Sequence, residues 1–264
     1  MGKMIEPIKS TQNETLKSVG KLHYKKQRDT TGLFVIEGRK EIEFALIGGF
    51  DLESLWVVSS HLSTALQLVK QHHLSCKLYE ITASCFEKIG YRETSEGLLA
   101  VGVQKHLTLE AFLPLESSLV IIADNIEKPG NLGALFRVAD GVGAQAVILS
   151  GRQDVYNPNV VRSSVGTLFS VPFFEAQTPV VSKELSLKNF TLIAADPHCK
   201  TNFGTFQYPK RTALIIGSEH SGVSEEWAAL AEQRVTIPMH GKNDSLNLSV
   251  SAGILAYAWR LNHP

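Results

Sequence analysis

The sequence predicts an α/β protein whose larger, C-terminal part is built around a parallel β-sheet. Short apolar runs in that part alternate with segments of helical spacing, which is typical of a parallel sheet covered by helices on both faces. A chain of 264 residues with 44% hydrophobic residues can form the cores of one large domain or two ordinary ones. The apolar runs cover residues 119–123, 146–149, 192–195, 213–216 and 235–237.

The N-terminal part has the pattern of a smaller α/β unit. Residues 11–14 have the spacing of a capping box and apolar residues follow at helical intervals, which predicts a basic amphipathic helix over residues 11–27. Apolar runs and Gly-rich stops predict the remaining elements. These are strands over residues 33–36, 55–58 and 98–103, and helices over residues 39–46 and 63–71.

A change of composition separates the two parts. Between residues 104 and 118 the apolar periodicity weakens and the polar and Pro content rises, as expected for a short linker. We therefore predict an N-terminal domain over residues 1–106, a linker over 107–117 and a C-terminal domain over 118–264.

The last segment, residues 248–261, is apolar on nearly all sides. A helix of this kind is expected to be buried on several sides. Packing against the sheet and against a second subunit would bury it, and so would the core of a monomer. The composition of the helix leaves both arrangements open.

Composition argues against several classes of protein. No run approaches the ~18 apolar residues of a membrane helix, and the first ten residues lack the apolar core of a secretion signal. Three cysteines without a C-x-x-C pair are typical of reduced thiols, and the nine histidines show no metal-ligand spacing such as H-E-x-x-H. We expect a cytoplasmic protein that binds neither a membrane nor a metal.

The charge is balanced, with 26 basic and 26 acidic side chains. This balance argues mildly against a nucleic-acid partner, because domains that bind nucleic acids usually have a pI above ~9. Residues 17–28 are an exception, since they contain no acidic residue and include His23 and Tyr24. They indicate either an RNA-binding face or an ordinary solvated helix face. The basic residues of this segment are Lys17, Lys21, Lys25, Lys26 and Arg28.

Ligands of parallel α/β sheets bind beyond the carboxyl ends of the strands, so we expect the residues that bind a ligand or take part in a reaction to lie in the loops at these ends. The first such loop covers residues 124–131. Pro129 and Gly130 predict a turn there, and Asn131 is a suitable N-cap for the following helix. Opposite the apolar stripe of that helix, Gly133 precedes Arg137 by one turn. This pair predicts a phosphate or ribose contact, with a plain surface arginine as the alternative.

Two later loops have the features of a site for a flat ligand. Gly217 directly follows a buried strand, where a glycine lets backbone groups approach a ligand, and Gly222 offers a positive-φ turn. In the loop over residues 237–247, Ile237 and Leu246 offer apolar surfaces for the two faces of an adenine. A plain strand-to-helix loop is the alternative for each.

Three other patterns have simple interpretations. Ser245 or Asn247 is expected to cap the final helix. Residues 218–220 contain Ser, Glu and His but no G-x-S-x-G elbow, which argues against a hydrolase. Residues 141–146 match G-x-G-x-x-A, but they follow a predicted helix and precede a strand, the reverse of the order in dinucleotide-binding folds.

Taken together, the three loops resemble the three motifs of the SpoU/TrmH family of RNA ribose 2′-O-methyltransferases. Their order, spacing and position at strand ends all agree over residues 119–261, and residues 33–46 with Glu37-Gly38-Arg39 resemble the substrate-binding domain often attached in front. The motifs are Asn131-x5-Arg137, Ile216-Gly-Ser-Glu219, and Ile237-Pro-Met239 followed by Ser245-Leu-Asn247. One departure is Lys128, where many relatives have an acidic residue.

The resemblance implies a fold and a set of roles. It implies a knotted C-terminal domain of the SPOUT type, a smaller N-terminal α/β domain that binds RNA, and a homodimer; the pattern alone could not suggest a knot. It also implies S-adenosylmethionine as the cofactor, with Arg39 added to the basic residues above as an RNA contact. The implied cofactor contacts are Gly217, Ser218, Ile237, Met239 and Leu246. The implied reaction centre is Asn131, Arg137, Glu219, Ser245 and Asn247.

The reaction implied is transfer of the cofactor's methyl group to a ribose 2′-hydroxyl, with ribosomal RNA as the expected substrate. The protein has to align the oxygen and help to remove its proton, and no metal is needed. A guanidinium is essentially never deprotonated in proteins, so we expect Arg137 to anchor phosphate and stabilise the oxyanion instead of acting as a base.

The sequence leaves two other functions open. The alternatives are a noncatalytic RNA-binding or ribosome-assembly factor and a methyltransferase acting on transfer RNA. A nucleotide-dependent oxidoreductase is disfavoured because its fingerprint is absent from the sequence.

Overall fold

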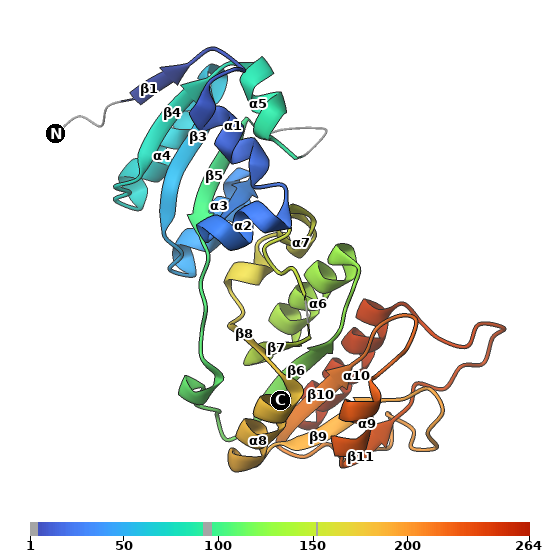
Figure 1. Ribbon diagram of the computed structural model, residues 1–264. Coiled ribbons are helices and arrows are strands. Elements are labelled where there is room, and N and C mark those ends of the chain that lie inside the picture. Colours follow the sequence, from blue (N-terminus) through green and yellow to red (C-terminus); the bar gives the residue numbers. More distant parts are fainter. Residues whose placement is uncertain (1–4, 92–96, 152) are drawn as a thin grey trace. The chain divides into compact units, whose positions relative to one another are not determined.

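The structure is a computed structural model that describes residues 5–91, 97–151 and 153–264. The chain forms two compact units (Figure 1). One contains the described residues up to Lys105 together with Asp154–Ser170, and the other contains His106–Gln153 and Val171–Pro264. The domain limits predicted from the sequence differ from these units, because they place residues 154–170 in the C-terminal domain. Those limits remain a proposal.

The first unit is built on a five-stranded sheet in the order β1-β4-β3-β5-β2. β5 runs antiparallel to its neighbours β2 and β3, and the other pairs are parallel. Helices α1 and α5 share an apolar core with one face of this sheet, and α3 and α4 lie on the other (Figure 1). The strands are β1 (Ile5–Ile8), β2 (Leu33–Glu37), β3 (Leu52–Val58), β4 (Lys77–Ile81) and β5 (Leu98–Val103).

The helices of the first unit come from two regions of the chain. Most precede residue 90, whereas α7 and η3 come from the segment Asp154–Ser170. In that segment Tyr156 Oη donates to the carbonyl of Lys105 (2.8 Å), and the Phe34 ring contacts both Tyr156 and Phe169. The helices are α1 (Glu14–Lys21), α2 (Lys25–Thr31), α3 (Arg39–Ile47), η1 (Ser59–His61), α4 (Leu62–Gln71), α5 (Ala83–Ile89), α7 (Pro158–Ser164) and η3 (Thr167–Phe169).

One expectation for this unit is wrong. The single helix predicted over residues 11–27 is two helices, and Asn13 instead of Thr11 caps the first. Between them the amides of Leu22, His23 and Tyr24 each bond three residues back, which makes a tight turn. The apolar stripe that predicted the helix is nevertheless buried. β1, β4 and α5 were not expected.

The second unit confirms the predicted parallel α/β architecture. Its six-stranded sheet has the order β11-β9-β10-β6-β7-β8, and every neighbouring pair is parallel. The strands are β6 (Ser118–Asp124), β7 (Ala146–Ser150), β8 (Phe173–Ala176), β9 (Thr191–Ala195), β10 (Arg211–Ile216) and β11 (Gln233–Val235). β8 was not expected, and β11 ends at the residue where a strand over residues 235–237 was predicted to begin.

Helices cover both faces of the parallel sheet (Figure 1). On one face α8 and α9 add Val181, Leu185 and Trp227 to the core. α6 and α10 pack against each other and against β7 and β10. The helices are η2 (Leu109–Ala111), α6 (Pro129–Val142), α8 (Thr178–Leu187), α9 (Glu225–Leu230) and α10 (Leu248–Asn262).

Two details of this unit bear on the sequence patterns. Residues 141–146 run from the end of α6 to the first residue of β7, with Gly143 as the left-handed C-cap of the helix (φ 66°), as expected for a helix stop. α10 is buried on one side only. Val250 and Tyr257 are each 48% exposed and Leu261 is 80% exposed.

Candidate active site

The carboxyl ends of β6 and β10 lie side by side, because the two strands are parallel neighbours in register Ile216↔Ala123. The loops that follow them therefore start at the same edge of the sheet. This is the edge at which ligands bind in parallel α/β sheets.

Asn131 joins these two loops. It lies in the first turn of α6, where Lys128 is the N-cap residue and Pro129 the first helical residue, so the expectation that Asn131 caps this helix is wrong. Instead its amide Nδ2 donates to Glu219 Oε1, and its Oδ1 accepts from Asn247 Nδ2 (3.2 Å). Three of the five polar residues implied by the family motifs are thus linked by hydrogen bonds.

Asn247 also caps α10, as expected. Its Oδ1 accepts from the amide of Ser249 (3.0 Å) and from the Ser249 hydroxyl (2.7 Å). The carboxamide therefore uses its oxygen for the helix and its nitrogen for Asn131. This double use fixes the start of the last helix beside the first turn of α6.

Arg137 is exposed on α6. The apolar stripe opposite it is buried, as predicted. Gly133 is buried too, so it does not lie open beside the arginine, and the expected pairing of a bare glycine with Arg137 is wrong. Within residues 5–91, 97–151 and 153–264 the guanidinium has no hydrogen bond or ion pair. Its donors are available to an anion.

The loop after β10 folds back on itself. Ser218 and Gly222 exchange two backbone hydrogen bonds of 3.0 Å, and Gly222 has a φ of 66°. The Cα of Gly217 lies so close to this turn that an added Cβ would overlap the backbone of Gly222 and Val223. Only glycine fits at position 217 without a shift of the loop.

A pocket of about 540 Å³ lies beside this loop. Its walls include every residue for which the family motifs imply a cofactor contact, and also Glu219 and Ser245. Its volume falls in the range of sites for ligands of this size, roughly 300–1,000 Å³. Apolar side chains and a bare backbone suit the flat adenine of S-adenosylmethionine, so the residues present fit this cofactor. The implied cofactor contacts in the wall are Gly217, Ser218, Ile237, Met239 and Leu246.

The comparisons with known proteins agree with this geometry. A model of the SpoU rRNA methylase family matches residues 118–257, a span of just over half the chain. This chain belongs to the SpoU rRNA methylase family. A second model, of the MRM3-like substrate binding domain, matches residues 13–100.

Relatives of the SpoU family resemble the chain over nearly its whole length. It is 29% identical over 262 residues to the 23S rRNA (guanosine(2553)-2′-O)-methyltransferase RlmP of Bacillus subtilis, covering 97% of this chain and 100% of that protein. A solved RNA 2′-O ribose methyltransferase is 36% identical with a TM-score of 0.84, covering 97% and 98% of the two chains. An AdoMet-bound rRNA methyltransferase from Sinorhizobium meliloti is 26% identical with a TM-score of 0.90, covering 98% and 99%.

Two carboxylates of this SpoU-family site were not predicted. Asp124, the last residue of β6, is buried and accepts from the amides of Ser224 (2.7 Å) and Asn125 Nδ2 (2.8 Å). Ser224 is the N-cap of α9, so this hydrogen bond connects the end of β6 to the end of the loop that follows β10. Asp196, directly after β9, lies in the pocket wall and pairs with Arg234 (3.2 Å). Both follow apolar runs that the sequence does reveal.

The basic residues implied as RNA contacts divide into two groups. Lys21, Lys25, Lys26 and Arg39 are exposed and Lys17 is half-buried. Arg28 is different, because it is 1% exposed and paired with Asp154. A buried, paired guanidinium is unavailable to RNA, so the assignment of Arg28 as an RNA contact is wrong.

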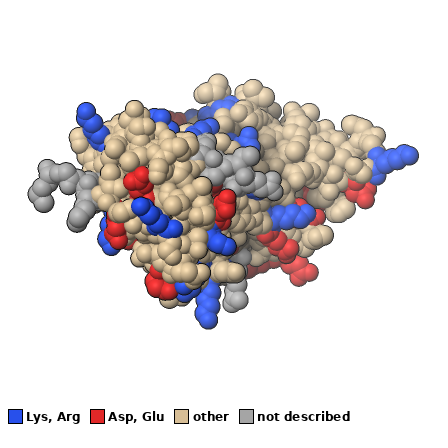
Figure 2. Space-filling model, turned by 90° about the horizontal axis from the view of Figure 1, so that it is seen from above, with Lys and Arg blue, Asp and Glu red and all other residues tan. Residues whose placement is uncertain are grey.

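Cations do not form one continuous field on the face shown in Figure 2, where Lys and Arg are interspersed with Asp and Glu. Several of the implied RNA contacts are themselves paired. Lys17 bonds Glu14 (3.0 Å), Lys25 bonds Asp29 (2.8 Å) and Arg39 bonds Glu43 (2.9 Å). On this face, attraction of a nucleic acid would have to come from local groups of cations.

Two features are absent from the described residues. No helix among them is long and apolar enough to span a membrane. No group of three or more His, Cys, Asp or Glu side chains in the same ranges is placed to hold a metal ion.

Proposed function

We propose that this chain transfers a methyl group from S-adenosylmethionine to a ribose 2′-hydroxyl of ribosomal RNA. The observation that carries the proposal is the hydrogen-bonded set of Asn131, Glu219 and Asn247 at the edge of a pocket suited to that cofactor. Relatives that are aligned over nearly the full chain and named as rRNA methyltransferases support the choice of substrate.

When bound, S-adenosylmethionine supplies a methyl group that its sulfonium makes electrophilic. The chain's own residues then have to position the ribose and stabilise charge on its oxygen. Asn131 is held by two neighbours and can orient a hydroxyl or a phosphate. Arg137 anchors a phosphate and stabilises the developing oxyanion, while the proton leaves to water or phosphate, because a guanidinium is a poor base.

We also propose a homodimer formed through α10. Its exposed face carries Val250, Tyr257 and Leu261, which is unusual for a surface that stays in water. The knot expected of the family is part of the same proposal. Because ribosomal RNA lies in the cytoplasm, we propose that the chain acts there.

Mapping ribose methylation across cellular RNA, with and without the gene, tests the substrate. We expect one ribosomal site to disappear on deletion and to return with the wild-type gene but not with the Arg137→Ala variant. A lost site in transfer RNA would show that the substrate assignment is wrong. If no site changes and calorimetry detects no saturable heat with S-adenosylmethionine, a noncatalytic RNA-binding factor is the better description.

A further inference from the structure

The turn between α1 and α2 presents an aromatic ring to solvent. Tyr24 is 71% exposed, although it lies next to a buried core. Its backbone is fixed, because its amide donates to Lys21 O (3.0 Å) and its carbonyl accepts from the amides of Gln27 (3.0 Å) and Arg28 (3.3 Å). A ring with so much exposure contributes little to packing in this unit.

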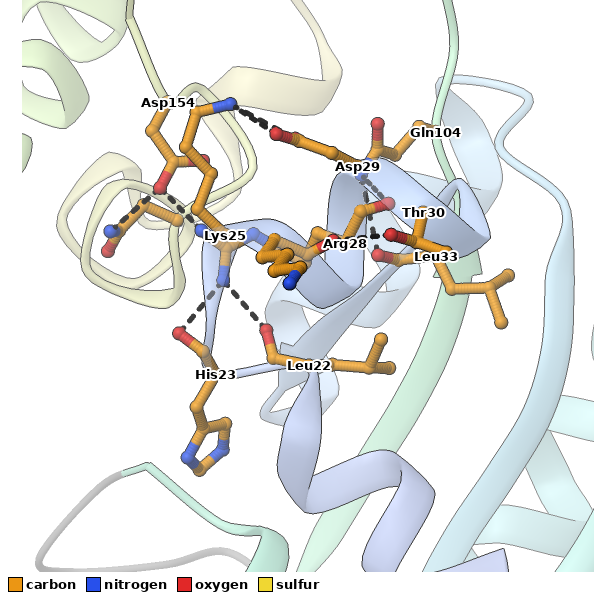
Figure 3. Close-up of polar contacts among 11 residues, drawn as sticks. Leu22, His23, Lys25, Arg28, Asp29, Thr30, Leu33, Gln104 and Asp154 are labelled. Atoms are coloured by element: carbon orange, nitrogen blue, oxygen red, sulfur yellow. Dashed lines mark hydrogen bonds and ion pairs between the residues drawn. The ribbon is translucent and has the colours of Figure 1, made fainter.

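Arg28 bonds the backbone of this turn (Figure 3). Its Nη1 donates to the carbonyls of Leu22 (2.7 Å) and His23 (3.0 Å), and its Nη2 pairs with Asp154. One planar guanidinium thus bonds both residues that precede Tyr24 and a residue of the Asp154–Ser170 segment. A hydrogen bond between His23 Nε2 and Ile89 O (3.0 Å) adds a further connection, to α5. The backbone that carries the exposed ring is therefore fixed by several hydrogen bonds.

Two cations beside Tyr24 are available for binding. Lys21 and Lys26 are exposed, and neither side chain has a hydrogen bond or ion pair with the residues described in the structure. Lys25, which lies between Tyr24 and Lys26, is already paired with Asp29. An exposed ring next to unpaired cations matches the surfaces that bind single-stranded nucleic acids, where bases stack on aromatic rings and cations follow the backbone.

We infer that Tyr24 stacks on an unpaired base of the RNA substrate, with Lys21 and Lys26 on the adjacent phosphates and Arg28 as the positioning residue of the turn. The inference rests on the proposed function, since it assumes an RNA substrate. It narrows that substrate to RNA with unpaired bases at the contact, because a ring cannot stack on a base inside an intact duplex.

Fluorescence anisotropy with the full chain and a short labelled oligouridylate, at several salt concentrations, tests the inference. For Tyr24→Ala we expect about a fivefold to hundredfold loss of affinity with an unchanged slope of log K against log salt, and Tyr24→Phe should restore the affinity. For Lys26→Ala the slope should fall by about 0.7, because one phosphate contact to a single strand is lost. Duplex RNA of the same length should respond weakly to Tyr24→Ala.

Matched controls come from α4, on the opposite face of the sheet. Leu66→Ala and Lys70→Ala remove an exposed apolar side chain and an exposed cation, and both should leave binding unchanged. Affinity that is unchanged in Tyr24→Ala, or that falls equally for single strands and duplexes, would overturn the inference. Methyl transfer to ribosomal RNA, measured in parallel with the wild type, tests the proposed function separately. Transfer can persist when the stacking contact is disproved.

Discussion

Arg137 differs from its neighbours in the candidate site, because Asn131 bonds both Glu219 and Asn247, while the guanidinium has no hydrogen bond or ion pair with the residues described. A polar group that the fold does not use is suited to a ligand that arrives later. In the proposed reaction the three bonded groups position the ribose, and Arg137 supplies the positive charge.

Replacement of Arg137 by Ala should slow methyl transfer by about a hundredfold to a thousandfold, the usual effect of removing one group that stabilises a developing oxyanion. Affinity for S-adenosylmethionine should not change, because Arg137 is not in the pocket wall. Single-turnover kinetics and calorimetry measure the two effects. Lys183→Ala, an exposed cation on α8, is the control, and an Arg137→Lys variant with full activity across the pH-rate profile would count against this role.

Gly217→Ala should abolish cofactor binding. The added Cβ would overlap the backbone of Gly222 and Val223, which cannot yield as a flexible side chain would, so the loop has to move. Gly204→Ala is a suitable control, since its Cβ would meet only Asn202 Oδ1 at an ordinary 3.4 Å. Calorimetry with S-adenosylmethionine distinguishes the two variants, and normal affinity in Gly217→Ala would show that the loop tolerates a side chain.

At the scale of elements, α2 is attached to the segment Asp154–Ser170 through one buried ion pair. Arg28 is almost completely buried, while Asp154 keeps 25% of its side chain exposed. Pairs of this kind are costly to break from one side, because the remaining partner groups stay buried without their bonds.

Arg28→Met should therefore lower the free energy of unfolding by about 3 kcal/mol, near the low end for a buried pair because Asp154 has access to water. Urea denaturation measures the loss. Arg39→Met, which breaks an exposed pair with Glu43, should cost less than about 1 kcal/mol. Equal losses in the two variants would mean that the Arg28 pair is not buried in solution.

The elements also show what a sequence can and cannot reveal. The loops at strand ends could be predicted because buried strands are continuous apolar runs; Gly217 directly follows one such run, and Ile237 ends another. Asp124 and Asp196 follow the same runs and could have been found by the same rule. The turn before Tyr24 was missed because the apolar stripe continues through it; Gly20, whose carbonyl accepts from the amide of His23, is the one residue there that could have marked it. The burial of Arg28 depends on Asp154, which is distant in sequence.

At the scale of the whole molecule, the parallel sheet and its helices follow from alternating patterns, whereas a knot or a dimer cannot be inferred from such patterns. Stability of the folded chain also depends on groups far from the site. Burial raises the pKa of Tyr208 from 10.0 to about 12. Its hydroxyl is buried without a hydrogen-bond partner among the described residues.

The raised pKa of Tyr208 predicts a loss of stability in alkali. The folded chain holds the phenol proton more tightly than the unfolded chain, so this contribution is complete below pH 10 and is lost as the pH rises from about 10 to about 12. The loss should approach about 2 kcal/mol. Urea denaturation of the wild type and Tyr208→Phe over this range measures it. Identical pH dependence in both proteins would rule out Tyr208 as the cause.

Methyl transfer to a ribose 2′-oxygen can be measured by incubating the purified chain with ribosomal RNA and S-adenosylmethionine labelled in its methyl group, and then digesting the RNA with alkali. A methyl group on the 2′-oxygen blocks the hydroxyl that cleaves the neighbouring phosphodiester. We expect the label to be recovered in alkali-resistant dinucleotides with the wild type and to be absent with Arg137→Ala. Label recovered in single nucleotides, or no label in the RNA, would contradict the proposed function.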